Sequence, residues 1–305
     1  MTPIDLMDAD SRITIASRSG DVLPFSRGIL ASSLLSTGIA TEEAYRLASV
    51  VQSRLLKFGT GTIDAEQLVG MIREILVDEE PDGTAERWLA WRTAKRSGRP
   101  VVVVFSGAPG VGKSTVAARM AVRFGISSVI TSDSIRDVLR TVIPVSVLPE
   151  LHRSTFELVD SEGPAQFSNF DRQANAVANA TVAVAQRLAA ERRSAILEGV
   201  HLLPGLIGRA LASHSARPVV IERLIVERSD DAHKAKLERR AISQPLRLGD
   251  RHVADIGRIR AIQSHLQTKA GASGTPTIGT ENLAQATHEI VDEIASLVDS
   301  EGVAP

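Results

Sequence analysis

The stretch VVVVFSGAPGVGKSTVAARM, residues 101–120, constrains the fold of this chain more than any other. Within it, GAPGVGKS fits the phosphate-binding pattern G-x-x-x-x-G-K-[ST]. The apolar run VVVVF before the glycines is typical of a buried parallel strand. The residues after the glycines put Val116, Met120 and Phe124 at helical spacing, and Gly125 is a stop signal. A strand, a glycine-rich turn and a helix in this order predict a nucleoside triphosphate site.

Each residue type of this loop suits a bound triphosphate. Glycines let the backbone direct its N–H groups at phosphate oxygens, and the start of the helix adds a partial positive charge. We predict that Lys113 contacts the β- and γ-phosphates and that the Ser114 hydroxyl ligates Mg²⁺, so ATP and Mg²⁺ are the predicted cofactors. The predicted nucleotide-binding residues are Gly107, Ala108, Pro109, Gly110, Val111, Gly112, Lys113, Ser114 and Thr115.

Polar residues follow the next predicted strand, SSVIT. The letters SDS after it indicate a helix N-cap, and the helix would have an apolar face made of Ile135, Val138, Leu139 and Val142. Asp133 would then lie at the carboxyl end of a parallel strand, where open α/β sheets bind ligands. We predict that Asp133 orients or deprotonates an acceptor hydroxyl and that Arg136 and Arg140 hold the acceptor's anionic groups. The alternative is a capping aspartate with two solvent-exposed arginines.

Two further segments complete the predicted site. The apolar strand SAILEG carries Glu198 near its end, where an acid usually holds Mg²⁺ directly or through water. His201 is a candidate for orienting the substrate, although a histidine leaving a strand is often a packing or capping residue. The helix after residues 229–231 carries Arg239 and Arg240, which we predict to close over the γ-phosphoryl group as a lid. Residues 234–260 hold eight Lys or Arg against three acids, an excess that a solvated helix face would also explain.

The alternation of strands and helices predicts the fold class. Strands near residues 101, 127, 194, 218 and 276 alternate with helices, as in a doubly wound parallel α/β sheet with helices on both faces. Residues 143–179 break this pattern with prolines and a glycine-proline pair, which predicts an insertion over the site rather than core helices. Three residues of this insertion are unranked candidates for acceptor contact: His152, Arg153 and Arg172.

The first hundred residues follow a different pattern. Residues 12–25 indicate two short strands joined by the turn RSGD, and Ser26 would cap a helix with Ile29, Leu30, Ser33 and Leu34 along one side. A second helix opens at Thr41 with an apolar stripe of Ala44, Leu47, Ala48, Val51 and Leu55. Amphipathic segments at 64–77 and 84–96 precede the turn-rich KRSGRP. We therefore predict a mostly helical domain over residues 1–96 and an α/β domain over residues 97–305.

Composition excludes several classes of protein. The 305 residues include no cysteine, which removes disulfides, cysteine-ligated zinc, iron–sulfur clusters and thiol nucleophiles. No apolar run reaches the length of a membrane span, and the first residues lack a secretory signal, so we expect a cytoplasmic protein with no membrane partner. The net charge of −1 and the few aromatic residues argue against a nucleic-acid partner.

Residues 11–96 resemble the ATP-cone, a small regulatory module that binds ATP or dATP. The resemblance rests on SRSGDVLPFSRGIL, GIATEEAYRLASVVQSRL and AERWLAWRTAKR. The family usually carries Lys-Arg-Asp-Gly in its first turn, whereas this chain has Ser17, Arg18, Ser19 and Gly20. The resemblance implies a second, regulatory nucleotide in this part of the chain.

Residues 100–297 resemble the 2-phosphoglycerate kinase family of P-loop enzymes. The motifs that carry the resemblance are GAPGVGKSTVA, SVITSDSIRDVLR, LPELHRST, ILEGVHLLPG, DDAHKAKLERRA and IGRIRAIQSHL. The family uses ATP and Mg²⁺ to convert 2-phosphoglycerate to 2,3-bisphosphoglycerate, so the resemblance implies this small anionic acceptor. Three alternatives stay open: a kinase of another glycerate-like or sugar acid, a nucleotide-sensing regulator, and a polynucleotide kinase. The sequence does not indicate the oligomeric state.

Overall fold

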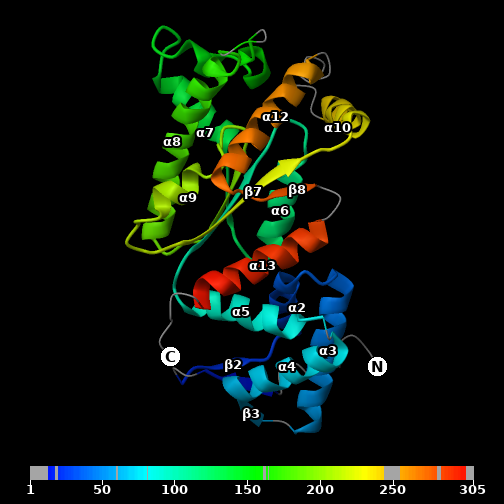
Figure 1. Cartoon of the computed structure of the whole chain (residues 1–305). Helices are drawn as coiled ribbons and strands as arrows, with labels where there is room; N and C mark the ends of the chain where they lie inside the picture. Colours follow the sequence, from blue (N-terminus) through cyan, green and yellow to red (C-terminus); the bar gives the residue numbers. More distant parts are fainter. Residues whose placement is uncertain are drawn as a thin grey trace. The chain divides into compact units, whose positions relative to one another are not determined.

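The chain falls into two compact units. The computed structural model describes residues 13–17, 20–59, 61–80, 82–160, 163, 165–243, 255–279 and 283–299. Unit 1 comprises Met1–Arg96, Arg123–Gly125 and Thr287–Pro305, and unit 2 comprises Ser97–Val122 and Ile126–Ala286 (Figure 1). The domain boundary after residue 96 stays a prediction, because a domain is a part of the chain that can fold alone.

Unit 2 is built on the predicted parallel sheet. Its strands are β4 (Val101–Ser106), β5 (Ser128–Thr131), β6 (Ala195–Gly199), β7 (Val219–Val226) and β8 (Thr277–Gly279). Their order is β5-β6-β4-β7-β8, and every neighbouring pair is parallel. All six residues of β4 are buried, as a central strand of valines requires. The doubly wound sheet and all five strand positions are confirmed.

Helices cover both faces of this sheet. They are α6 (Lys113–Phe124), α7 (Ser132–Val142), α8 (Ser168–Ala190), α9 (Leu206–Leu211), α10 (Asp230–Ser243) and α12 (Ile256–Ser273), with the short 3-10 helices η2 (Pro149–His152) and η3 (Thr155–Leu158) between α7 and α8. On one face, α8 and α9 pack Ala185, Leu188 and Ile207 against Val102, Val104 and Leu197 of the sheet, and α6 lies on the other face (Figure 1).

The segment 143–179 corrects the sequence prediction in part. The prolines do precede an irregular stretch, but α8 begins at Ser168 and runs for 23 residues. Its buried face includes Phe170, Ala174, Val177 and Ala178, so residues 168–179 belong to a core helix. The small size of the alanines hides the helical period, because an alanine on either face of a helix looks alike in the sequence.

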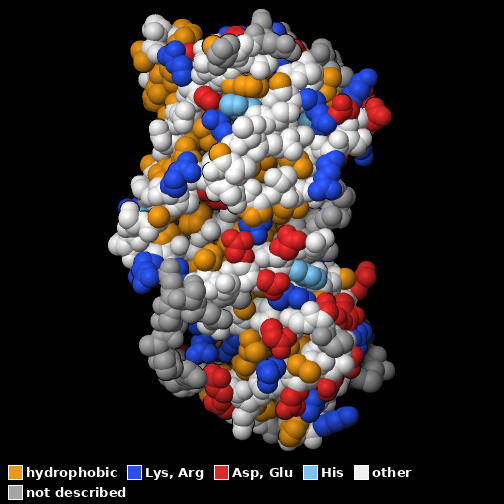
Figure 2. Space-filling view, viewed as in Figure 1, with side chains coloured by type: hydrophobic (Ala, Val, Ile, Leu, Met, Phe, Trp, Pro, Cys, Tyr) orange, Lys and Arg blue, Asp and Glu red, His pale blue; other side chains and the backbone are white. Residues whose placement is uncertain are grey.

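Helix α7 also differs from its prediction in two respects. Thr131, not the SDS segment, is its N-cap, because the Thr131 side chain accepts a hydrogen bond from the Ser134 backbone N–H at 3.0 Å. Its predicted apolar face is largely uncovered: the exposed fraction is 62% for Val138 and 71% for Val142. Figure 2 shows a group of hydrophobic side chains at the upper left of unit 2.

Unit 1 contains the predicted hairpin and helices. Strands β1 (Ile13–Ala16) and β2 (Val22–Pro24) pair antiparallel, and an unpredicted strand β3 (Gly61–Asp64) pairs parallel to β1. The helices are α2 (Arg27–Leu34), α3 (Thr41–Lys57), α4 (Ala65–Glu79) and α5 (Thr84–Arg96), with the 3-10 helix η1 (Leu35–Thr37) after α2. Helix α13 (Leu283–Asp299) belongs to unit 1 from Thr287 onward.

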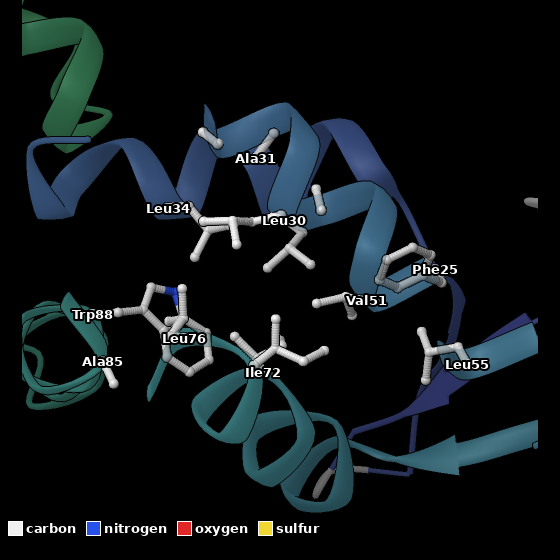
Figure 3. Packing of buried hydrophobic residues seen from close by; sticks show 14 of the residues in the cluster. Phe25, Leu30, Ala31, Leu34, Val51, Leu55, Ile72, Leu76, Ala85 and Trp88 are labelled. Carbon is white, nitrogen blue, oxygen red and sulfur yellow. The ribbon is translucent and has the colours of Figure 1, made fainter. Parts of the chain in front are cut away.

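The core of unit 1 brings α2, α3, α4 and α5 together around Leu34, Val51, Leu76 and Trp88 (Figure 3). The predicted stripe of α3 is buried in full. Ser26 caps α2 as predicted, with its hydroxyl oxygen 3.3 Å from the Ile29 backbone nitrogen. The placement of Ile29 on the apolar side was wrong, since 74% of its surface is exposed. Within the described parts of both units, no helix is long and apolar enough to cross a membrane.

Candidate active site

The glycine-rich loop joins β4 to α6 in the conformation that its sequence predicts. Gly107 has φ +151°, and a Cβ placed on it would lie 2.4 Å from the Ile225 carbonyl oxygen. Gly110 has φ +81°, and its Cβ would lie 2.4 Å from Cδ2 of Leu237. Both positions therefore need glycine for backbone conformation and for space. The loop thus approaches β7 and α10 at distances that no side chain would permit.

The two predicted Mg²⁺ ligands lie together beneath this loop. The Ser114 hydroxyl donates a hydrogen bond to Glu198 Oε1 at 2.9 Å. Glu198 is on β6, directly beside Phe105 of β4, so the sheet register fixes the acid next to the start of α6. A hydroxyl and a carboxylate are ligands that Mg²⁺ accepts, and Mg²⁺ commonly takes only one or two from the protein. The pair fits a nucleotide-bound Mg²⁺.

Lys113 places a positive charge at the glycine-rich loop. Its side chain is only 8% exposed, and its Nζ donates to the Ala108 carbonyl oxygen at 2.9 Å. A buried ammonium group in a glycine-rich loop is positioned to neutralise a phosphate. The residues present therefore fit ATP as well as Mg²⁺.

A buried histidine lies close to Asp133, a predicted acceptor-binding residue. His201 Nδ1 is 2.8 Å from Ser132 Oγ, and His201 Nε2 is 3.2 Å from Gln173 Oε1. Gln173 donates its amide group to the carbonyl oxygens of Glu150 at 2.6 Å and Arg153 at 2.9 Å, so its own oxygen must accept. His201 therefore donates from Nε2 and accepts from Ser132 at Nδ1.

Burial keeps this histidine neutral. Desolvation is the main cause that lowers the pKa of His201 to about 4; Arg136 and Lys113 lower it further, and Asp133 opposes them. Gly199 makes room for the pair, since a Cβ at this position would lie 1.8 Å from Ser132 Oγ. The role of His201 in substrate binding stays a prediction, and both of its ring nitrogens are engaged inside the protein.

Asp133 is the exposed member of this group. Its Oδ1 lies 3.8 Å from His201 Nδ1, and its side chain is 56% exposed. It sits in the first turn of α7, directly after β5. The carboxylate is therefore accessible to a bound molecule at the carboxyl edge of the sheet.

The predicted acceptor-binding arginines differ in their surroundings. Arg136 Nε donates to the Leu151 carbonyl oxygen at 2.9 Å, and its guanidinium also donates to the Arg153 carbonyl. Burial lowers the pKa of Arg136, and the positive charge of Arg140 adds to this. Arg140 is more exposed and lies 3.4 Å from Asp137. Arg136 thus holds η2 in place, while Arg140 keeps a weak, solvent-facing ion pair.

The other three candidates, His152 and Arg153 between α7 and α8 and Arg172 on α8, contact residues at the end of α7 or between the two helices. His152 Nε2 is 2.9 Å from the Ile143 carbonyl oxygen, and Arg153 donates to the Glu157 carbonyl. Arg172 pairs with Glu150 Oε1 at 3.0 Å. Glu150 Oε2 is buried and has no hydrogen-bond partner among the described residues.

The predicted lid begins as a well-anchored helix. Ser229 caps α10 by accepting from the Ala232 backbone N–H at 3.2 Å. Lys236 pairs with Glu227, and Arg260 donates to the Glu227 carbonyl oxygen at 2.7 Å and pairs with Asp230. Part of the positive excess in residues 234–260 is therefore matched by acids within unit 2.

Of the two predicted lid arginines, Arg239 is the one whose side chain is described. Arg239 is exposed and donates to the Ala235 carbonyl of its own helix at 3.2 Å. The side chain of Arg240 lies outside the described residues, as do Arg247 and Arg251. Their proposed closure over a phosphoryl group stays a prediction.

Two residues of the site were missed by sequence reasoning. Gln173 is the polar residue in the buried face of α8, and His233 of α10 is fully buried against the glycine-rich loop. A glutamine surrounded by alanines at helical spacing was a signal for the first. His233 had no comparable signal, because its neighbours in the sequence are mostly charged.

Comparison with known proteins adds the family. Residues 102–268 match the model of an AAA domain family. A 2-phosphoglycerate kinase of Pyrococcus furiosus is 35% identical over 289 residues, covering 92% of this chain and 93% of that protein. A 2-phosphoglycerate kinase of Methanocaldococcus jannaschii is 31% identical over 307 residues, covering 97% of each chain. The crystal structure of a gluconokinase from Sinorhizobium meliloti 1021 is 15% identical with a TM-score of 0.39, covering 66% of this chain and 95% of that chain.

Proposed function

The chain belongs to the 2-phosphoglycerate kinase family, and from this premise we propose that it transfers the γ-phosphoryl group of ATP to 2-phosphoglycerate. The products would be ADP and 2,3-bisphosphoglycerate. The observation that carries the proposal is the hydrogen bond between Ser114 and Glu198 at 2.9 Å, below a glycine-rich loop with a buried Lys113. The similarity to named 2-phosphoglycerate kinases extends over nearly the whole chain, which favours this acceptor over other acids.

In this reaction the C3 hydroxyl oxygen of the acceptor forms a bond to the γ-phosphorus, and the bond from that phosphorus to the β–γ bridging oxygen breaks. The hydroxyl proton leaves with solvent or with Asp133, whose exposed carboxylate lies at the rim of the sheet. Phosphoryl transfer needs little general-base assistance, so we assign Asp133 mainly to orienting the hydroxyl.

Mg²⁺ would be held by Ser114 and Glu198 with the phosphates of ATP. When bound, it neutralises charge on the β- and γ-phosphates. Lys113 adds a further positive charge at the floor of the loop, and the backbone N–H groups of residues 107–115 hold the phosphates. Exclusion of water by a closed lid would protect the phosphoryl group from hydrolysis, a role that we assign to Arg239 and Arg240.

The acceptor carries a carboxylate and a phosphate, so it needs cationic partners. Arg140 is exposed and only weakly paired with Asp137 at 3.4 Å, which leaves it able to turn to an anion. Arg136 donates to two carbonyl groups beside η2 and would shape the pocket more than bind the ligand. We therefore place Arg140 ahead of Arg136 as the anion-binding residue.

The experiment that tests this function is acceptor-dependent ADP formation. The protein with Mg-ATP is offered 2-phosphoglycerate, 3-phosphoglycerate, glycerate and several phosphorylated sugar acids, with Lys113→Ala as the control. We expect ADP to form quickly with 2-phosphoglycerate alone and not with the Lys113→Ala variant. A response to a different acid would replace the acceptor, and slow hydrolysis independent of any acceptor would favour a nucleotide-sensing protein instead.

We further propose that unit 1 binds a regulatory nucleotide, as its resemblance to the ATP-cone suggests. The turn of the hairpin is closed by Ser17, whose backbone N–H donates to the Asp21 carbonyl at 2.8 Å and whose hydroxyl accepts from the Asp21 N–H at 3.1 Å. Arg18 and Ser19 lie outside the described residues. Calorimetric titration of the Lys113→Ala variant would test this, because one ATP should still bind per chain. We place the enzyme in the cytoplasm, which supplies ATP.

A further inference from the structure

The helix α10 contacts the glycine-rich loop through a buried histidine. His233 is fully buried, and its ring Nε2 is 2.8 Å from the Pro109 carbonyl oxygen. Desolvation lowers the pKa of His233, so the ring is neutral near pH 7 and carries a single N–H. Because a carbonyl oxygen can only accept, this N–H is on Nε2. The other ring nitrogen, Nδ1, has no hydrogen-bond partner among the described residues.

This hydrogen bond fixes the orientation of one peptide group of the loop. In a trans peptide, the carbonyl of one residue and the N–H of the next point in opposite directions. No peptide bond of the described residues is cis. The Pro109 carbonyl is directed at α10, so the Gly110 N–H is directed away from α10. Pro109 has no N–H of its own, so the Gly110 N–H is the first backbone donor after that of Ala108.

A second contact holds the same peptide group from the side. A Cβ placed on Gly110 would lie 2.4 Å from Cδ2 of Leu237 and 3.3 Å from Nε2 of His233. Leu237 is one helical turn after His233, so both side chains come from one face of α10. The helix cannot slide along the loop without losing one of these contacts.

The start of α10 is itself fixed to the end of β7. Lys236 pairs with Glu227, and Gln263 of α12 donates to the Glu227 carbonyl oxygen at 2.9 Å. The Ser229 N–H donates to Glu227 Oε1 at 3.1 Å. Residues 230–237 are thus tied to the sheet, and the contact with the loop has a rigid support.

From these contacts we propose that His233 is a positioning residue of the nucleotide site, which holds the Pro109–Gly110 peptide group so that the Gly110 N–H faces the phosphates. The proposal rests on the proposed function only in taking ATP as the ligand. A buried ring nitrogen without a partner is destabilising, and an apolar side chain would avoid this loss. A buried polar atom without a hydrogen-bond partner is expected mainly where function requires the residue. The hydrogen bond to the loop is what the imidazole contributes and a leucine would not.

A matched pair of amides tests this role. In His233→Gln the amide nitrogen can take the place of Nε2 and still donate to Pro109, whereas in His233→Asn the shorter side chain places it near the position of Nδ1. We expect His233→Asn to raise the Kd for Mg-ATP about tenfold, the effect of about 1.4 kcal/mol. His233→Gln should stay within about threefold of the wild type. Isothermal titration calorimetry measures both constants without any turnover, with the titration of Lys113→Ala giving the part that comes from ATP bound by unit 1.

Controls separate positioning from loss of fold. Lys234→Ala changes the exposed neighbour on the same helix and should bind Mg-ATP as the wild type does. The Kd for 2-phosphoglycerate should not change in either His233 variant, and thermal unfolding should be measured for both. Equal Mg-ATP affinity of the folded Asn and Gln variants would overturn the proposal. A wild-type protein that binds Mg-ATP but phosphorylates no acceptor would overturn the proposed function and leave this comparison valid.

Discussion

The nucleotide side and the acceptor side of the site are built in different ways. The proposed nucleotide side centres on one continuous segment, residues 101–124, in which a strand, a turn and a helix follow one another. The acceptor side depends on hydrogen bonds between residues far apart in the chain, such as His201 with Ser132 and Gln173. Backbone groups would bind phosphates in the first, whereas side chains hold backbone carbonyls in the second. A local motif therefore reveals the ATP site, and only the tertiary structure reveals how the acceptor lobe, residues 132–173, is held.

Glu198 joins the two sides, and its loss should have the largest effect. Glu198→Gln keeps the size of the side chain and removes the charge next to Ser114. We expect kcat to fall about a thousandfold, because Glu198 would hold the Mg²⁺ that neutralises the charge developing on the transferred phosphoryl group in the transition state. Steady-state kinetics over a range of Mg²⁺ concentrations measures this.

Glu222→Gln is the matched control for that change. Glu222 is a partly buried acid on β7, but it accepts from the backbone N–H groups of Gly205 and Gly208, at 2.5 and 2.6 Å. Its kcat should stay within about twofold of the wild type. Equal losses in both variants would mean that a buried acid in the sheet, rather than a Mg²⁺ ligand, explains the result.

The neutral His201 makes the acceptor side sensitive to acid. Its pKa is about 4 in the folded protein against an ordinary 6.5, so below pH 6.5 the unfolded chain binds a proton that the folded chain does not. His201 should therefore make the free energy of unfolding fall as the pH drops from 6.5 to 4, by about 3 kcal/mol in all. Urea unfolding at several pH values measures this change.

The same titration of His201→Gln isolates the contribution of this ring. In this variant the free energy of unfolding should fall much less between pH 6.5 and 4. The fall that remains should come from other groups, including His233. An unchanged slope in the variant would show that His201 is protonated in the folded protein and that its buried hydrogen bonds are described wrongly.

Gln173 should affect the acceptor and leave ATP alone. Gln173→Leu removes the donor to the carbonyl oxygens of Glu150 and Arg153 and the acceptor for His201. We expect KM for 2-phosphoglycerate to rise roughly ten- to thirtyfold and the Kd for Mg-ATP to stay within about twofold. Thr181→Val is the control, since Thr181 is buried on the same helix and its hydroxyl donates to the Val177 carbonyl oxygen of that helix at 2.9 Å. A rise in the Kd for Mg-ATP would show that Gln173 also affects the nucleotide side, and would contradict the separation of the two sides.

Asp133 should show the smallest effect of the four. Asp133→Asn keeps a polar group that can still accept from the acceptor hydroxyl, so we expect kcat to fall about tenfold. Asp137→Asn, one turn later on α7 and exposed, serves as the control. Turnover near the wild-type rate in Asp133→Asn would remove the carboxylate from the mechanism.

Sequence patterns predicted those parts of the molecule in which each residue's role depends on its neighbours in the chain. The five strands, the glycine-rich loop, Glu198 at the end of its strand and the stripe of α3 are of this kind. The start of α8 was missed because alanine is common on both faces of a helix. Strand β3 was missed because it is four residues long and mostly exposed.

The acceptor lobe could not be predicted for a different reason. Arg136 looks like an anion-binding residue in the sequence, yet it donates to two carbonyls of the segment around η2, a segment that only the fold brings near. Gln173 donates to Arg153, which is 20 residues away in the sequence, and His233 contacts Pro109, which is 124 residues away. No local pattern encodes a partner at such a separation.

The most direct test of the central claim is the identity of the phosphorylated product. Phosphorus-31 NMR of the protein with Mg-ATP and 2-phosphoglycerate should show the resonances of 2,3-bisphosphoglycerate growing in step with those of ADP, one product per ATP consumed. Inorganic phosphate growing in step with ADP, with the 2-phosphoglycerate resonance unchanged, would contradict the account.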